Sequence, residues 1–160
     1  MIALQITSLV LVVVAMVPAL AHALELPGKL RLGKDAYFAV QPIYYPGFTI
    51  AGAAEPLAIV STIVLLLLTP RASAQFWLTL VGTLGVIGMH AVYWVFTHPV
   101  NNFWLRDEKL GGLGTAFFSR GASRSVQADW TKLRDRWEYS HVARSALAVI
   151  SFIALLIVLV

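Results

Sequence analysis

Four long apolar stretches dominate the sequence and restrict the folds that are open to it. A helix that crosses a bilayer needs about 20 mainly apolar residues, and the stretches of this length cover residues 2–24, 48–69, 76–96 and 140–160. Only 12% of the residues are charged and the mean hydropathy is +0.78, whereas a soluble domain has roughly 25% charged residues. We therefore predict an all-α integral membrane protein, a single four-helix bundle over residues 1–160.

The first stretch also has features of a secretory signal peptide. Ala19-Leu20-Ala21 and Ala21-His22-Ala23 have the small-residue spacing of cleavage sites. No basic segment precedes the stretch, however, and its apolar run is longer than the roughly 7–15 residues of a signal peptide. We therefore expect a permanent membrane helix.

The basic residues are distributed unevenly over the connections between the stretches. Arg71 alone lies in the second connection. The others are Lys29, Arg31 and Lys34 in the first connection, and Arg106, Lys109, Arg120, Arg124, Lys132, Arg134, Arg136 and Arg144 in or just after the third. The positive-inside rule then predicts that both basic connections are cytoplasmic and both termini outside, in the cell (inner) membrane. The net charge of +4 orients the chain in a bilayer and does not indicate nucleic-acid binding.

The long cytoplasmic loop predicted between the third and fourth helices covers about residues 97–139, too many to be structureless in a compact protein. We expect a flexible middle and an apolar segment that dips into the interface; these are Gly111, Gly112, Gly114 and Gly121, and Ala116-Phe117-Phe118. A helical repeat then follows Asp129, a suitable N-cap residue; it consists of Trp130, Leu133, Trp137 and His141. We predict that the fourth helix begins near Asp129, well before the membrane, and that Trp104, Trp130 and Trp137 lie in an interfacial belt.

Few ionisable residues occur in or beside the apolar stretches, and all lie toward the predicted cytoplasmic end. They are His22, Glu25, Glu55, His90, Glu138 and His141. Such side chains are costly in a membrane and usually functional. His22 and Glu25 are three residues apart, as are Glu138 and His141, so each pair shares a helix face. Because the first and last spans run in opposite directions, we expect the pairs to meet with like groups facing.

This set of side chains suggests a metal site. In soluble bundles, two Glu-x-x-His pairs and two further glutamates bind di-iron or di-manganese centres. Glu55 supplies one further carboxylate here, and the second is missing. We predict a buried cavity in which iron or manganese is favoured; the predicted metal ligands are His22, Glu25, His90, Glu138 and His141. The sequence contains no cysteine, which excludes thiolate ligands, disulfides and iron–sulfur clusters.

A simpler interpretation exists for two of these residues. Glu25 and Glu138 lie near the interface and would pair with Lys29, Arg134 or Arg144 as snorkelling charges. This interpretation suits His22, Glu55 and His90 less well, because no cation lies at their depth in the sequence.

Pro56 follows Glu55 directly and weakens a helix there, because it lacks an N–H and its ring clashes with the carbonyl of Gly52. Irregular backbone at membrane depth survives where it lines a cavity or packs in protein. A helix starting at Pro56 would be too short to span. We therefore predict a kink beside a buried carboxylate, and a pocket wall at that point.

The third stretch carries a polar stripe and a group of glycines. His90 shares the stripe with Thr83, Trp94 and Thr97. The glycines are Gly82, Gly85 and Gly88, and at this density they favour close helix packing. His98, directly before Pro99 at the boundary, is expected at the surface.

Four segments of the chain are typical of one family. They are His22-Ala-Leu-Glu-Leu-Pro-Gly-Lys29, Ala39-Val-Gln-Pro-Ile-Tyr44, Pro99-Val-Asn101 and Trp130-Thr-Lys-Leu-Arg134-Asp-Arg-Trp137-Glu-Tyr-Ser-His141-Val-Ala-Arg144. With the four spans, they resemble the anthrone oxygenase-like family of small membrane proteins, and the first segment resembles a bacterial branch of it. Many members are catalogued only as a domain of unknown function. The resemblance covers nearly the whole chain, and the last segment is its most specific part.

The resemblance implies a four-helix membrane bundle, and characterised fungal relatives oxidise anthrones to anthraquinones. It also implies that His141, Arg134 and Arg144 form the cytoplasmic motif of the family. Pro99 and Asn101 would form the exit of the third span.

The leading hypothesis is a membrane oxygenase or oxidase that uses its metal to activate oxygen toward a lipid-soluble, anthrone- or quinol-like aromatic. Glu55 would accept a proton, and Arg134 would pair with a phenolate. The predicted substrate pocket consists of Tyr44, Tyr45, Trp94, Trp137 and Asn101.

Two alternatives remain open. One is a protein that binds haem b, with His22 and either His141 or His90 as axial ligands and with Glu25 and Glu138 orienting the imidazoles. The other is a non-catalytic membrane scaffold whose cytoplasmic loop binds a partner. The expected partners are otherwise the lipid bilayer, a small hydrophobic substrate and, in a homo-oligomer, further copies of the chain.

Overall fold

The computed structural model describes residues 1–104 and 129–160, and all regular structure within them is helical. Four helical stretches are long and apolar enough to cross a membrane. They are α1 (Ile2–Lys29), α3 with α4 (Gly47–Gly52 and Ala54–Leu68), α5 with η2 and α6 (Ala74–Val92, Tyr93–Thr97 and His98–Trp104), and α8 (Trp130–Leu159). The chain is thus an all-α, multi-pass membrane protein, as its apolar stretches predict.

Part of the connection between α6 and α8 lies outside the described residues, from 105 to 128. The expectations for its glycines and its apolar segment fall in this part. They concern Gly111, Gly112, Gly114, Gly121, Ala116, Phe117 and Phe118.

The first and last spans are longer than their apolar runs. α1 continues past Leu24 to Lys29. α8 begins at Trp130, where the side chain of Asp129 accepts a hydrogen bond from the backbone N–H of Thr131 at 3.1 Å. The predicted early start of the last helix is therefore confirmed.

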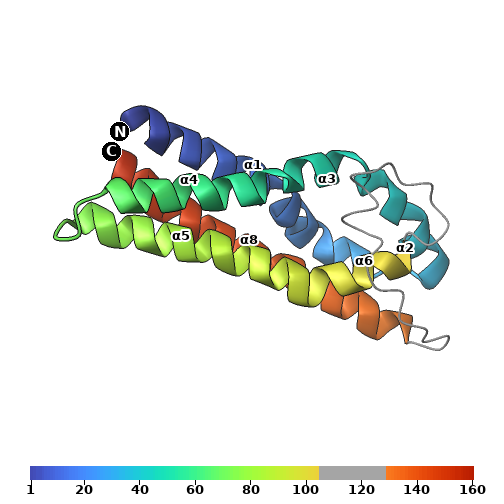
Figure 1. The fold of residues 1–160 in the computed structure, drawn as a ribbon. Helices are drawn as coiled ribbons and strands as arrows, with labels where there is room; N and C mark the ends of the chain where they lie inside the picture. Colours follow the sequence, from blue (N-terminus) through green and yellow to red (C-terminus); the bar gives the residue numbers. More distant parts are fainter. Residues whose placement is uncertain (105–128) are drawn as a thin grey trace.

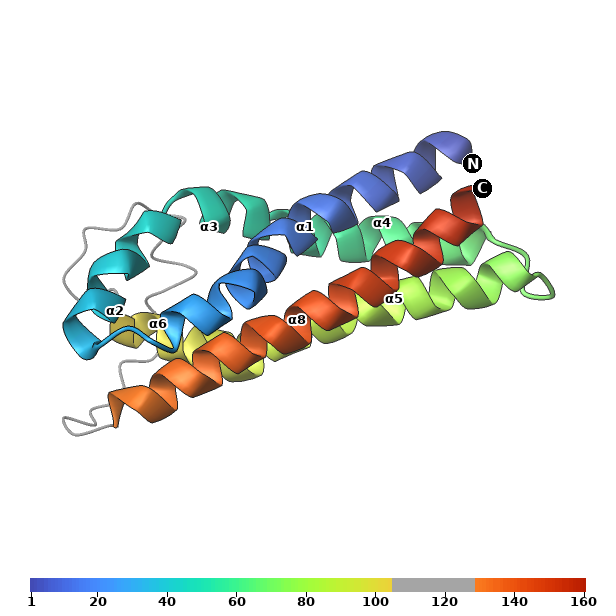
Figure 2. The same cartoon turned by 180° about the vertical axis from the view of Figure 1, so that it is seen from behind.

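Both chain termini lie at one end of the bundle, and α2 (Lys34–Val40) and η1 (Gln41–Tyr44) lie at the other (Figures 1 and 2). α1 and α8 therefore run in opposite directions, and they pack against each other. We call the end with Met1 and Val160 the terminal half and the end with α2, η1 and α3 the pocket half.

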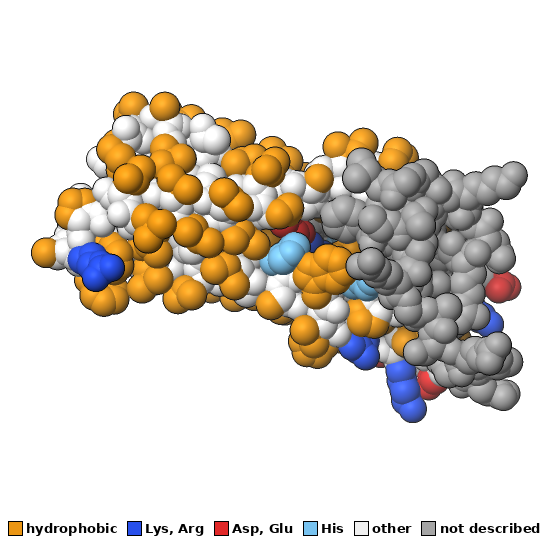
Figure 3. All heavy atoms as spheres, viewed as in Figure 1, with side chains coloured by type: hydrophobic (Ala, Val, Ile, Leu, Met, Phe, Trp, Pro, Cys, Tyr) orange, Lys and Arg blue, Asp and Glu red, His pale blue; other side chains and the backbone are white. Residues whose placement is uncertain are grey.

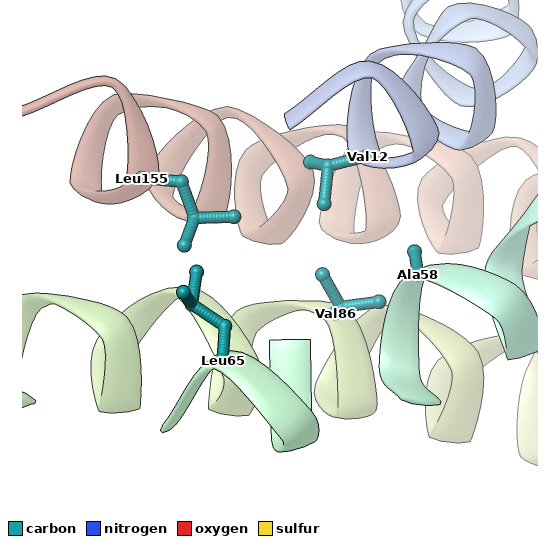
Figure 4. Close-up of a cluster of buried hydrophobic side chains, with 5 residues drawn as sticks. All are labelled: Val12, Ala58, Leu65, Val86 and Leu155. Atoms are coloured by element: carbon teal, nitrogen blue, oxygen red, sulfur yellow. The ribbon is translucent and has the colours of Figure 1, made fainter. Parts of the chain in front are cut away.

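Apolar side chains from all four spans meet in the core of the terminal half. Val12, Ala58, Leu65, Val86 and Leu155 lie together there, and the close-up shows them between the helices (Figure 4). The hydrophobic effect does not drive helices together in lipid, because the lipid tails are as apolar as the side chains. Close packing of such side chains therefore holds the spans together.

The glycines of α5 let it approach α8 closely. A Cβ atom added at Gly85 would lie 2.9 Å from the backbone oxygen of Leu147, and one at Gly82 would lie 2.8 Å from Cγ of Leu155. The hydroxyl of Ser151 donates to the carbonyl of Gly82 at 2.6 Å. The prediction that these glycines serve helix packing is confirmed.

The spans are irregular in the pocket half. α3 ends at Gly52 and α4 begins at Ala54, directly before Glu55 and Pro56. The predicted break beside a buried carboxylate is thus confirmed. In the third span, the π-helical turn η2 interrupts the α-helix, and such turns occur frequently at functional sites.

Hydrophobic side chains cover the visible face of the terminal half, whereas most charged side chains in this view lie toward the pocket half (Figure 3). The predicted surface position of His98 was wrong. Trp104 and Trp137, expected in an interfacial belt, are 7% and 5% exposed and pack inside the protein. His98 is 5% exposed and stacks on Trp94, with ring centroids 4.7 Å apart. The reason is that α6 extends the third span, and Trp104 there packs against Tyr37 of α2.

Candidate functional site

A pocket lies among the spans of the pocket half, bordered by η1 and α3, with an empty volume of about 690 Å³ that includes its open mouth. Its aromatic lining consists of Tyr44, Tyr45, Phe48, Tyr93, Trp104 and Trp137. Its polar lining includes His22, Glu55, Thr97, Asn101, His141 and Arg144. The pocket therefore combines stacking surfaces with a small number of buried polar groups, as small-molecule sites do.

His22 and His141 touch each other in the wall of this pocket. Their ring centroids are 4.2 Å apart, and both residues are buried. The ring of Trp137 contacts both, with centroids 4.7 Å from His22 and 4.4 Å from His141. The expectation that the antiparallel spans bring these two histidines together is confirmed.

Lys29 is buried and surrounded by three acceptors. Its Nζ lies 2.8 Å from Nδ1 of His22, 3.0 Å from an oxygen of Glu25 and 3.5 Å from the carboxylate of Glu138. Glu138 itself is fully buried and accepts a hydrogen bond from the hydroxyl of Tyr37 at 2.8 Å. The two carboxylates thus meet at one cation, so like groups do face each other as expected.

Two tyrosines outside the spans complete this network. Burial raises the pKa of the Tyr37 phenol, and the carboxylate of Glu138 raises it further. Burial likewise raises the pKa of Tyr44, with a further contribution from its hydrogen bond to Glu25 at 2.7 Å. Both hydroxyls therefore stay protonated and donate to carboxylates.

Arg144 forms the centre of a second network, one turn after His141 on α8. Its Nη2 donates to Glu55, and its Nη1 lies 3.1 Å from Nδ1 of His141. The other oxygen of Glu55 lies 3.0 Å from Nδ1 of His90. Nε2 of His90 in turn accepts from the indole N–H of Trp94 at 2.9 Å. The expectation of no cation at the depth of Glu55 and His90 was wrong.

The same expectation was wrong for His22, which Lys29 contacts. Side chains on a helix tilt toward its N-terminus, so Lys29 reaches back along α1 toward His22. Arg144 extends in the same sense along α8, toward His141, and the break before α4 brings Glu55 to it. Both cations therefore act inside the bundle and do not snorkel to the interface.

The described residues do not fit the predicted metal site. Among them, no group of three or more histidine and carboxylate side chains is placed to hold a metal ion. A metal-bound histidine usually donates its second N–H to a carboxylate or carbonyl, whereas the Nδ1 atoms of His22 and His141 face Lys29 and Arg144. The two imidazoles also touch, so they leave no gap for a porphyrin between them.

Several predicted site residues lie outside the pocket lining. Glu25 lines an adjacent open groove, and Glu138 and His90 act through Lys29 and Glu55 as described above. Trp94 is 45% exposed. Arg134 donates to the neighbouring Asp135 at 2.9 and 2.7 Å, and its guanidinium lies over the ring of Trp130.

Sequence reasoning missed Lys29, Tyr37 and Thr97 as site residues. Lys29 follows His22 by seven residues, a two-turn spacing that places both on one helix face, so a signal was present. Tyr37 lies in a connection without periodicity, and Thr97 reaches the pocket on the π-helical turn. No sequence pattern marks Tyr37, and the polar stripe that includes Thr97 did not indicate its place in the pocket lining.

The predicted pocket residue Asn101 lies in the lining and is held in place by its neighbour. Its side-chain oxygen accepts from the indole N–H of Trp137 at 2.6 Å. Tyr44, Tyr45 and Trp137 also line the pocket, as predicted.

Comparison with known proteins identifies the family. The profile of the anthrone oxygenase family matches residues 43–154, well over half of the chain, including Glu55, Trp137 and the His141–Arg144 pair. No curated protein and no solved structure matches the chain. The four spans and the match together show that this chain belongs to the anthrone oxygenase family.

Proposed function

We propose that this chain is a membrane oxygenase that oxidises a lipid-soluble, electron-rich aromatic of the anthrone or quinol kind in the pocket of the pocket half. The observation that carries the proposal is that Glu55, His22 and His141 line one aromatic-walled pocket in a membrane bundle. The family match supports the oxygenase class.

The chemistry requires no further reductant. Oxidation of a ring methylene to a carbonyl removes two hydrogens from carbon and adds one oxygen atom. The second oxygen atom of O2 leaves with the two hydrogens as water. The carbon loses four electrons and O2 gains four, so electrons balance with O2 as the only oxidant.

Each group in the pocket has a role in this reaction. The carboxylate of Glu55 accepts a proton from the methylene, and Arg144 and His90 hold it in place. Removing this proton makes the ring carbon electron-rich enough to react with O2. The rings of Tyr44 and Trp137 provide stacking surfaces for the flat substrate.

The test uses the full-length protein in lipid nanodiscs with anthrone itself as the probe. We expect anthraquinone to form with one O2 consumed per molecule, and Glu55→Gln to reduce the rate at least about a hundredfold, since general bases contribute roughly 10²–10⁴. Asp135→Asn, on a half-exposed carboxylate outside the pocket lining, is the matched control. Equal rates for Glu55→Gln and the native protein would overturn the proposal.

Metal analysis and an absorption spectrum of the same sample test the two cofactor hypotheses. One iron or manganese ion per chain, with activity lost on chelation, would support the metal hypothesis in place of the metal-free reaction. The absorption band of haem would support the haem hypothesis. Absence of turnover by a folded sample would favour the scaffold hypothesis.

We also propose that the pocket half lies on the cytoplasmic side of the cell membrane. Among the described residues, Arg71 is the one basic side chain in the connection at the terminal end, whereas those of the first connection lie at the other end. Because the chain has no cysteine, single cysteines report orientation cleanly. A cysteine at position 71 should react with a membrane-impermeant maleimide in intact cells, and one at position 34 should not; the reverse pattern contradicts this orientation.

A further inference from the structure

We propose that His22 and His141 form a paired N–H donor site for a negatively charged oxygen, a phenolate or enolate, and that Lys29 and Arg144 hold both imidazoles in the required tautomer. The inference rests on the pocket being the substrate site of the proposed function. It assigns the ligand class of the histidine pair and makes the two cations positioning residues.

The tautomer of His22 follows from the groups around Lys29. An ammonium has three N–H donors and no acceptor, and Nζ has three acceptors around it: Nδ1 of His22, Glu25 and Glu138. Nδ1 of His22 must therefore accept. A neutral imidazole that accepts at Nδ1 carries its hydrogen on Nε2.

The same reasoning applies to His141. A guanidinium only donates, and Nη1 of Arg144 lies 3.1 Å from Nδ1 of His141. His141 therefore also carries its hydrogen on Nε2. Two different cations, from α1 and from α8, thus impose the same tautomer on two rings that touch.

The Nε2–H of His141 has no partner among the described residues, although it is buried. A buried donor without an acceptor is costly, so such groups are usually satisfied. His141 lines the pocket together with His22. An oxygen atom of a bound ligand would satisfy this donor, and the adjacent ring would supply a second.

The charged atoms nearest to each imidazole are cationic. Nζ of Lys29 lies 2.8 Å from Nδ1 of His22 and Nη1 of Arg144 lies 3.1 Å from Nδ1 of His141, whereas a carboxylate oxygen of Glu25 lies 3.8 Å from Nδ1 of His22. Both rings therefore present N–H donors at Nε2, which an anionic oxygen can accept and a cation cannot. Hydrogen bonds to a charged acceptor are stronger than neutral ones, so the pair stabilises the anion of a phenol more than the phenol.

The first experiment measures binding without turnover. The probe is 1,8-dihydroxyanthraquinone, a phenol whose anion differs in colour from its neutral form and which already carries the carbonyl. Bound to the full-length protein in nanodiscs, it should ionise at a pH at least one unit lower than the free probe, a tenfold change in its acid constant.

Two variants of similar size make this test specific. His141→Gln keeps an N–H donor near the position of Nε2 and should retain most of the shift, whereas His141→Leu should lose most of it. The proposal is overturned if the bound probe titrates like the free probe, or if the two variants behave alike.

The second experiment reads the tautomers directly by nitrogen NMR of ¹⁵N-histidine-labelled protein, with His22 and His141 assigned by substitution. The native protein should show both rings protonated at Nε2. Lys29→Met should give His22 a mixture of tautomers and leave the tautomer of His141 unchanged. If Lys29 had only a structural role, its substitution would not change the tautomer of His22 alone. Protonation at Nδ1 in the native protein would overturn the proposal.

These measurements separate the two proposals, because neither needs turnover. A protein that binds the probe as an anion but does not oxidise anthrone would retain the donor site and refute the oxygenase function. A protein that oxidises anthrone but leaves the bound probe neutral would retain the oxygenase function and refute the donor site.

Discussion

The two halves of the bundle solve the problem of helix association in a membrane differently. In the terminal half, glycines and small side chains let α5 and α8 approach closely around an apolar cluster. In the pocket half, the same spans carry buried cations, carboxylates and imidazoles that contact one another. The first half depends on close packing, with hydroxyl groups such as that of Ser151 bonded to the backbone, whereas the second depends on each buried charge having a partner.

Backbone regularity differs in the same way. The spans are continuous α-helices through the apolar cluster, and the break before Ala54 and the π-helical turn both fall in the pocket half. Irregular backbone at membrane depth persists where it lines a cavity, and residues beside both interruptions line the pocket, such as Glu55 and Thr97. The pocket thus lies where the backbone is least regular.

The largest expected effect is the loss of a buried charge partner. Arg144→Met leaves Glu55 buried without its cation, and we expect a loss of about 3–5 kcal/mol in unfolding free energy, since that is the cost of breaking a buried pair. Denaturant unfolding in detergent measures it. The double variant Glu55→Leu with Arg144→Met should recover most of this stability while remaining inactive. A double variant no more stable than Arg144→Met would show that the pair is not coupled.

A smaller effect is expected from overpacking the terminal half. Gly85→Ala places a Cβ atom against the backbone oxygen of Leu147, which cannot move freely, and should cost about 1–3 kcal/mol. At Gly88 the nearest atom is the side-chain Cδ1 of Leu147 at 3.4 Å, so Gly88→Ala is the matched control and should be neutral or slightly stabilising. Turnover per folded molecule should be unchanged in both. Equal stability losses would contradict the difference in packing.

The hydrogen bond from Tyr37 to Glu138 gives the pocket half a dependence on alkaline pH. The pKa of Tyr37 is raised in the folded protein, so its contribution is present below the unfolded-state value of about 10 and is lost as the pH rises above it. Unfolding free energy should stay level up to about pH 10 and then fall. Tyr37→Phe should cost about 1 kcal/mol at neutral pH and flatten this fall. An unchanged alkaline slope in the variant would exclude Tyr37 as its source.

The smallest effect concerns the start of α8, beyond both halves. Hydrogen bonds from Thr131 lower the pKa of Asp129. The ionised carboxylate therefore caps the helix at any pH above the ordinary pKa of an aspartate, and the cap is lost as the pH falls through the lowered pKa. Asp129→Ala should speed amide hydrogen exchange in the first turn and leave turnover unchanged. Slower activity with normal exchange deeper in α8 would show that this turn also shapes the pocket.

Spacing predicted the meeting of His22 and His141, because antiparallel spans with His-x-x-Glu and Glu-x-x-His must align like groups. The same reasoning did not predict the two cations beside these histidines. Lys29 lies about 10 Å along the helix from His22, beyond the predicted end of the span, and only the continuation of α1 with a side chain that extends backwards brings it to the ring. Arg134 was expected to pair with a phenolate, yet it donates to Asp135 and is not part of the pocket lining.

By itself, the sequence determined the membrane bundle, the four spans, the break before Glu55 and the concentration of titratable groups at one end. Length, hydropathy and proline chemistry act locally or over one helix, so they can be followed along the chain. Tertiary structure alone decided which cation meets which ring. That choice depends on helix rotation, on the interruptions at Ala53 and η2, and on the reach of Lys29 and Arg144. A histidine pair that spacing indicated as a metal site is thereby faced by two cations.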